Sequence, residues 1–199
     1  MRTKWRRLLA IILFAPVIFL VMVNIHEIGH TLLARALGDE DAVYYLYREF
    51  DTDKACFGCN IYNPRKLTAF ENTLVTVAGV LSSQLVVLGL LWLWSRRTRH
   101  PGHHYLMVTA IIIFASDVPF QVFRGIRADV ASQTGLVRVD LADFLYILHR
   151  TLALPVDAGK IGLLLVAAAY CLWLFRAVRS RLKRPRSMSA GELDAVDAG

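Results

Sequence analysis

The chain has 199 residues, a formal net charge of +7 and a composition that is 56% hydrophobic and 20% charged. This composition is too apolar for a disordered chain, and the length predicts one domain. The basic residues gather beside long apolar runs and not on an aromatic-interleaved face, so we expect no nucleic-acid partner and a lipid bilayer as the environment.

The first predicted element is a membrane helix from Trp5 through Leu37, kinked at Pro16. It contains an uncharged stretch from Leu8 to Ile25, long enough to cross the hydrocarbon layer. A signal peptide is the alternative, because basic residues precede the run and residues 34–36 (Ala-Arg-Ala) resemble a cleavage site. The run exceeds the usual apolar region of a signal peptide, which is about 7–15 residues, so we expect the helix to be retained.

A polar segment follows the first helix and predicts a small hairpin or surface loop outside the membrane. It covers residues 39–66 and contains a strand-like sequence at Val43–Tyr47. Three more spans are then predicted, at residues 67–94, 105–123 and 158–175. Before the last of them, Leu141–Leu154 predicts a helix that is too short and too polar to cross lipid freely.

These elements predict an all-α polytopic membrane protein with about four transmembrane helices. Residues 1–186 are expected to form a single membrane-embedded domain, and residues 187–199 a disordered tail. Basic clusters beside the first, second and last apolar runs place the N-terminus and the C-terminus in the cytoplasm. Cys56 and Cys59 then lie on the opposite side, where a local disulfide and two free thiols both remain open.

The sequence His26-Glu27-Ile28-Gly29-His30 interrupts the first apolar helix with three ionisable side chains. Residues four apart share one face of a helix, so both imidazoles can ligate one metal ion. Glu27 projects beside that ion, where its carboxylate can accept a proton from a metal-activated water and pass it on to a leaving amine. Ionisable residues are costly inside a membrane, and this cost favours a functional reading over a merely interfacial helix surface.

Residues 26–38, HEIGHTLLARALG, resemble the site-2-protease family of intramembrane zinc metalloproteases, in its short branch without an accessory domain. Residues 78–83 in the second span are similar to the Ala-Gly-rich second helix of the family core. The resemblance covers about residues 8–130. It implies a Zn²⁺ cofactor held by His26 and His30, Glu27 as the catalytic residue, and a membrane-protein substrate.

The family usually supplies its third zinc ligand as an aspartate in an N-x-x-P…D-G setting. Residues 116–119 (Ser-Asp-Val-Pro) occupy the place of N-x-x-P, and no Asp-Gly follows at the usual distance. Asp129 is the preferred third ligand, because a single aspartate follows this loop in the short branch. Asp157, in a shortened Pro-x-x-Asp-Gly-Gly, and Asp117, within the third apolar run, remain the alternatives.

The resemblance therefore predicts hydrolysis of a peptide bond in or near a membrane segment of another protein. The alternative is a catalytically inactive membrane scaffold or regulator of the same fold. The charge pattern places the motif near the non-cytoplasmic end of its helix, whereas family members commonly carry zinc towards the cytosol. The sequence leaves the side on which the zinc opens, the substrate and the oligomeric state open.

Overall fold

The structure, a computed structural model, describes residues 2–50, 54–97, 101–128 and 140–183. In chain order its elements are α1 (Arg2–Ala36), β1 (Val43–Phe50), β2 (Lys54–Ile61), the short 3-10 helix η1 (Pro64–Lys66), α2 (Ala69–Arg97), α3 (Pro101–Ala115), α4 (Asp117–Arg127), α5 (Asp140–Leu152) and α6 (Val156–Lys183). Two compact units divide the chain after Ala167, within α6. All the residues of the site described below belong to the first unit.

Four helical segments in the described part of the chain are long and apolar enough to cross a membrane. They are Leu8–Ala36, Ala69–Ser95, Tyr105–Arg127 and Val156–Leu182. Each of the first three agrees with a predicted span to within a few residues at its ends. The last begins near its predicted start but ends at Leu182, later than predicted. The prediction of an all-α polytopic membrane protein is therefore confirmed, and the chain is an integral multi-pass membrane protein. The predicted tail at residues 187–199 lies outside the described residues.

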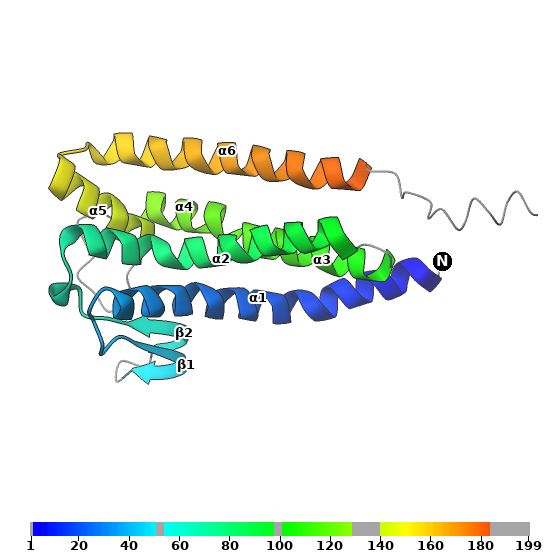
Figure 1. Ribbon diagram of the computed structural model, residues 1–199, viewed down its shortest axis with the longest axis horizontal. Coiled ribbons are helices and arrows are strands. Elements are labelled where there is room, and N and C mark those ends of the chain that lie inside the picture. Colours follow the sequence, from blue (N-terminus) through cyan, green and yellow to red (C-terminus); the bar gives the residue numbers. More distant parts are fainter. Residues whose placement is uncertain (1, 51–53, 98–100, 129–139, 184–199) are drawn as a thin grey trace, which may run out of the picture. The chain divides into compact units, whose positions relative to one another are not determined.

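The predicted hairpin is present between α1 and α2. Strands β1 and β2 pair antiparallel, with Val43 opposite Ile61 and Tyr45 opposite Cys59. The hairpin lies beside the C-terminal half of α1 (Figure 1). Gly58 has a φ of +62°, and a Cβ atom there would lie 3.1 Å from Val23 of α1, so glycine permits the close approach of β2 to this helix.

The third span is interrupted near its middle, which separates α3 from α4. Ser116 lies between the two helices, and the hydrogen-bond ladder continues there through Ser116 N–H to Ile112 and Phe120 N–H to Ser116. Proline at position 119 has no N–H, so it cannot donate to the carbonyl of Ala115. The break starts a new helix, whose first turn carries Asp117.

The outer face of α1 is apolar, and the bundle buries several polar side chains among its apolar ones. Leu9, Leu13 and Val17 of α1 are each more than half exposed, as expected where lipid covers the surface. The polar and charged residues buried in the spans are His26, His30, Thr31, Thr76, Ser83, Asp117 and Gln121. Buried polar groups at membrane depth are costly and mark functional regions, so these residues indicate where a functional site lies.

Glycines allow α1 and α2 to pack closely at the level of the motif. A Cβ atom on Gly29 would lie 2.9 Å from the backbone oxygen of Ala78 and would overlap the Ser82 side chain. Small residues at a helix interface bring the two backbones together in this way. This packing sets the histidines of α1 directly against α2.

Candidate metal centre

The two histidines of the motif lie on the buried face of α1. His26 is 3% exposed and His30 is 2% exposed. Their Nε2 atoms are 3.1 Å apart, because one helical turn separates the residues and both rings turn towards α2. The helical spacing in the sequence therefore corresponds to a real pair of converging nitrogen atoms.

Asp140, the first residue of α5, supplies a third donor to the same point. Its Oδ2 atom lies 2.9 Å from His26 Nε2 and 3.3 Å from His30 Nε2. The three residues form a group whose ligand atoms all lie within 4.8 Å of one another, with Asp140 partly buried. Two imidazole nitrogens and one carboxylate can hold a divalent cation and leave a further position open.

The opposite nitrogen of each ring is occupied by a buried acceptor. His26 Nδ1 lies 2.8 Å from Asp117 Oδ2, and His30 Nδ1 lies 2.6 Å from the backbone oxygen of Val75. Each Nδ1 donates a proton to its acceptor, so a ring that loses its second proton directs an Nε2 lone pair at the point where the three atoms converge. Metal-binding histidines are commonly fixed by the same kind of contact.

Gly79 of α2 leaves the space that these rings occupy. A Cβ atom at this position would lie 2.4 Å from His30 Nε2 and 2.5 Å from His26 Nε2. These distances are shorter than a van der Waals contact, so any larger residue would displace the rings or the helix. Glycine thus keeps α2 close to the point at which the three ligand atoms converge.

The electrostatics of the group keep its carboxylate ionised. Burial would raise the pKa of Asp140, but the hydrogen bonds and positive charge of the protonated His26 and His30 rings outweigh it and hold the pKa below its usual range. A cation that replaced the protons on the two Nε2 atoms would find an ionised carboxylate as its oxygen donor.

Glu27 lies next to the ligand group on α1, and a residue of the hairpin holds its carboxylate. Asn60 of β2 donates a hydrogen bond of 2.7 Å from Nδ2 to Glu27 Oε2. Tyr44 of β1 bonds in the same region to Asn24, one turn earlier on α1. The hairpin therefore holds the carboxylate of Glu27, which the sequence suggests as the catalytic residue. The sequence offered no signal for this role of the hairpin.

The aspartates proposed from the sequence as third ligands have different positions. Asp129, the preferred candidate, lies outside the described residues. Asp117 is buried and contacts the other nitrogen of His26, so in this structure it supports a ligand and does not join the group. Asp157 is exposed at the start of α6 and is not a member of the group.

The sequence patterns do not single out Asp140 as a ligand. They predict the short helix from Leu141, one residue after its first residue in the structure. An acidic residue at the start of an amphipathic helix too short to span the membrane is the signal that was available. The same feature, however, is typical of an ordinary helix N-terminus, where a carboxylate is favourable.

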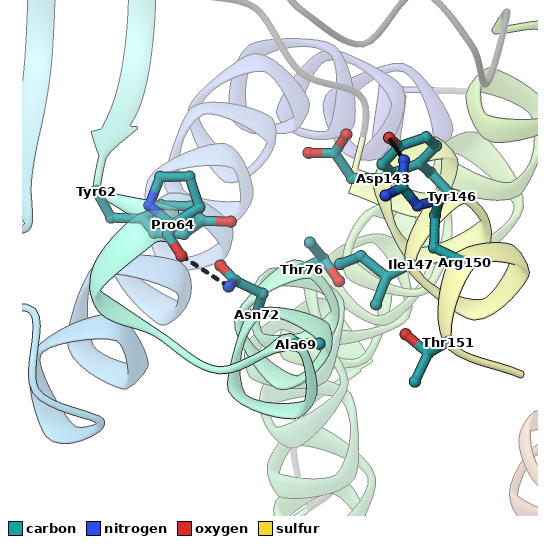
Figure 2. Close-up of a pocket in the computed structure, with 10 residues that line it drawn as sticks. All are labelled: Tyr62, Pro64, Ala69, Asn72, Thr76, Asp143, Tyr146, Ile147, Arg150 and Thr151. Carbon is teal, nitrogen blue, oxygen red and sulfur yellow. Dashed lines mark hydrogen bonds between the residues drawn. The ribbon is translucent and has the colours of Figure 1, made fainter.

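A pocket of about 450 Å³ lies between the first turns of α2 and the helix α5 (Figure 2), and its lining includes none of His26, His30 and Asp140. Thr76, in its wall, follows the residue whose carbonyl accepts from His30. Asp143, also in the wall, lies one turn after Asp140. Its complete lining is Tyr62, Pro64, Ala69, Asn72, Thr76, Asp143, Tyr146, Ile147, Arg150 and Thr151.

The pocket is polar at its rim and is built partly by hydrogen bonds between its own residues. Asn72 donates to the carbonyl of Pro64 at 2.9 Å, which fixes the chain between β2 and α2. Arg150 donates to the hydroxyl of Tyr146 at 3.1 Å and lies over its ring (Figure 2). Helix α5 therefore carries both Asp140 of the candidate metal group and one wall of the pocket.

Comparison of the chain with models of known protein families, with curated proteins and with solved structures finds no match.

The cysteines of the chain differ in their state. Cys59 of β2 is disulfide-bonded and Cys171 is a free thiol, while the side chain of Cys56 lies outside the described residues.

Proposed function

We propose that this membrane protein is an intramembrane zinc metalloprotease that hydrolyses a peptide bond in or near a membrane segment of another protein. The convergence of His26, His30 and Asp140 in the interior of the bundle is the observation that carries the proposal. Three protein ligands and one open position are the usual arrangement of a catalytic zinc site. The resemblance of residues 26–38 to the site-2-protease family is the second support.

The dimensions of the ligand group suit zinc. Tetrahedral coordination with bonds of roughly 2.0–2.1 Å sets neighbouring donor atoms about 3.3 Å apart. The separations among the three donor atoms run from 2.9 to 3.3 Å. A divalent cation at this point would replace the protons that otherwise lie between the two Nε2 atoms and the carboxylate.

Glu27 would act as the proton carrier in the reaction. When bound, zinc supplies a polarised scissile carbonyl and a water that loses its proton near neutral pH. The Glu27 carboxylate takes that proton as the water attacks and delivers it to the leaving amine. Asn60 donates to one oxygen of this carboxylate, which leaves the other free to carry the proton.

A peptide in an extended conformation is the form of substrate that such a site requires. The backbone carbonyls of a membrane helix are already hydrogen-bonded, so the helix must unwind locally before its amide can react. Asn72, Thr76 and Arg150 in the pocket between α2 and α5 offer hydrogen-bonding groups to a chain that has lost its own. We therefore propose that this pocket receives the substrate residues next to the cleaved bond.

The orientation of the chain in the membrane belongs to the same proposal. Basic residues before α1 and at the end of α6 favour a cytoplasmic N-terminus and C-terminus. The disulfide of Cys59 supports this orientation, because disulfides persist on the oxidising, non-cytoplasmic side. Introduced cysteines at Arg2 and Glu40 should then be labelled by membrane-impermeant reagents from opposite sides.

The test compares the wild-type protein with Glu27→Gln in the cells that contain it. Membranes from both are labelled at free N-termini, and the labelled peptides are identified by mass spectrometry. New termini within apolar segments should arise only with the wild type, and cleavage by Glu27→Gln should be lower by about 100-fold or more. Glu40→Gln, at an exposed glutamate after α1, is the matched control and should cleave as the wild type does.

Metal content separates the protease from the inactive scaffold. The purified wild type and Glu27→Gln should each contain one equivalent of zinc, whereas His30→Ala should contain none. If the wild type and Glu27→Gln both contain zinc and their membranes yield the same set of new N-termini, the inactive scaffold is favoured. Absence of bound zinc from the wild type would contradict the proposal itself.

A further inference from the structure

Two residues of α4 flank the same imidazole. Asp117 lies 2.8 Å from His26 Nδ1, and Gln121, one turn later, places its amide Nε2 3.3 Å from His26 Nε2. Residues four apart share a helix face, so α4 presents both side chains to the ring. Asp117 accepts the Nδ1 proton, while Gln121 faces the side of the ring on which the ligand atoms of Asp140 and His30 converge.

The carboxamide of Gln121 is almost completely enclosed and only partly satisfied. The residue is 5% exposed. Its Oε1 atom is buried and has no hydrogen-bond partner among the described residues. A buried amide left without partners costs free energy, so the side chain is expected to gain partners when the site is filled.

A cation at the ligand group changes what Gln121 can bind. The Nε2 lone pair of His26 would then be directed at the cation and would no longer accept from the amide. Among the described residues, the amide N–H₂ of Gln121 would then have no other acceptor. A donor in that place can serve an oxygen atom that carries negative charge.

We propose that Gln121 is a substrate-facing hydrogen-bond donor of the reaction. The inference rests on the proposed function and adds a residue to it. The amide donates to the carbonyl oxygen of the scissile peptide, and the bond strengthens as the attack of water moves negative charge onto that oxygen. Such preorganised donors in an enclosed site commonly supply a large part of catalysis.

The experiment uses the full-length protein with Co²⁺ in place of zinc, and acetohydroxamate as an anionic oxygen probe. Visible absorption reports Co²⁺ binding, and titration with acetohydroxamate reports the affinity for the probe. Gln121→Met keeps the length of the side chain and removes the amide. We expect it to bind Co²⁺ within about 3-fold of the wild type and acetohydroxamate about 10-fold or more weakly, as for loss of a hydrogen bond to a charged group.

Two further variants control for folding and for the loss of any buried amide. Gln84→Met removes an amide from α2, where its Nε2 contacts the carbonyl of Phe114 at 3.3 Å, and should bind the probe as the wild type does. Gln121→Glu is isosteric and cannot donate when ionised. It should lower the affinity for acetohydroxamate at least as much as Gln121→Met does, while it still binds Co²⁺.

The outcomes separate this inference from the proposed function. Unchanged affinity of Gln121→Met and Gln121→Glu for acetohydroxamate, or an equal loss in Gln84→Met, would overturn the role of Gln121 and leave the metal site intact. A weakened Co²⁺ affinity with an altered spectrum before the probe is added would also overturn it, because Gln121 would then act on the cation. A wild type that binds no Co²⁺ would overturn both.

Discussion

The Nδ1 atom of His26 lies 2.8 Å from a carboxylate oxygen of Asp117, and both side chains are buried within the bundle. This contact fixes the tautomer of the ring and aims its Nε2 atom at the ligand group. It also connects α4 to the motif of α1, from which it is separated by 91 positions in sequence. Its loss should therefore act on the metal and not on the fold alone.

Asp117→Asn should reduce the affinity for zinc by roughly 10–100-fold, because the neutral amide orients the ring less firmly and makes it a weaker donor. Competition with a chromogenic chelator measures this affinity on the purified protein. Asp157→Asn, at an exposed position, is the control and should leave the affinity unchanged. Equal affinity in both variants would show that the buried contact does not support the ligand.

Asp140→Ala should abolish stoichiometric zinc binding, because two imidazoles alone leave the site one ligand short. Metal analysis after dialysis against a mild chelator gives the stoichiometry. Asp129→Ala is the informative comparison, since Asp129 is the ligand expected from the family resemblance. Full zinc content in Asp140→Ala together with its loss in Asp129→Ala would replace our assignment with that expectation.

Gly79→Ala should lose most of its bound metal, because the added methyl group would lie within 2.6 Å of three atoms of the histidine rings. The rings would turn away or α2 would shift, and either change separates the donor atoms. Gly89→Ala lies on the same helix, where an added Cβ meets no atom within 4 Å, and should bind metal normally. Similar losses in both would indicate a general effect on α2.

Asn60→Ala should lower kcat while metal content and KM stay close to the wild type. The reason is that Glu27 keeps its charge but loses the hydrogen bond that orients its carboxylate. Cleavage kinetics on a substrate identified by N-terminal labelling measure the split between kcat and KM. Asn63→Ala, which removes a cap at the base of the hairpin, controls for displaced strands and should have a smaller effect on kcat.

Ile147→Trp should raise KM with an unchanged zinc content, because the larger ring fills part of the pocket between α2 and α5. The same cleavage kinetics report the change. Leu152→Trp adds the same ring at an exposed position near the end of α5 and should be neutral. An unchanged KM in Ile147→Trp would show that the substrate does not enter this pocket.

Much of the fold could be predicted from local patterns. Long uncharged runs specify membrane helices because the bilayer has a fixed thickness and every backbone polar group must be paired within it. The hairpin was predicted from a strand-like segment that proved longer, Val43–Phe50. The boundary between α3 and α4 was not predicted, although Pro119 marks the position at which the ladder loses a donor.

The site divides in the same way between near and distant positions in the chain. His26 and His30 are adjacent because an α-helix brings residues one turn apart onto one face, and this relation is visible in the sequence alone. Asp140 lies 114 positions after His26, and its approach depends on how α5 packs against α2 and α4. Nothing in its own neighbourhood distinguishes it from an acidic residue that starts a helix.

The sequence by itself determined that this chain spans a membrane and carries two imidazoles and a carboxylate on one helical turn, because helix periodicity and bilayer thickness act on neighbouring residues. Only the tertiary structure brought Asp140 beside the two histidines, Asp117 to the other nitrogen of His26, and Asn60 and Gln121 to the same region. These relations depend on packing between helices far apart in sequence, and such packing has no local signature.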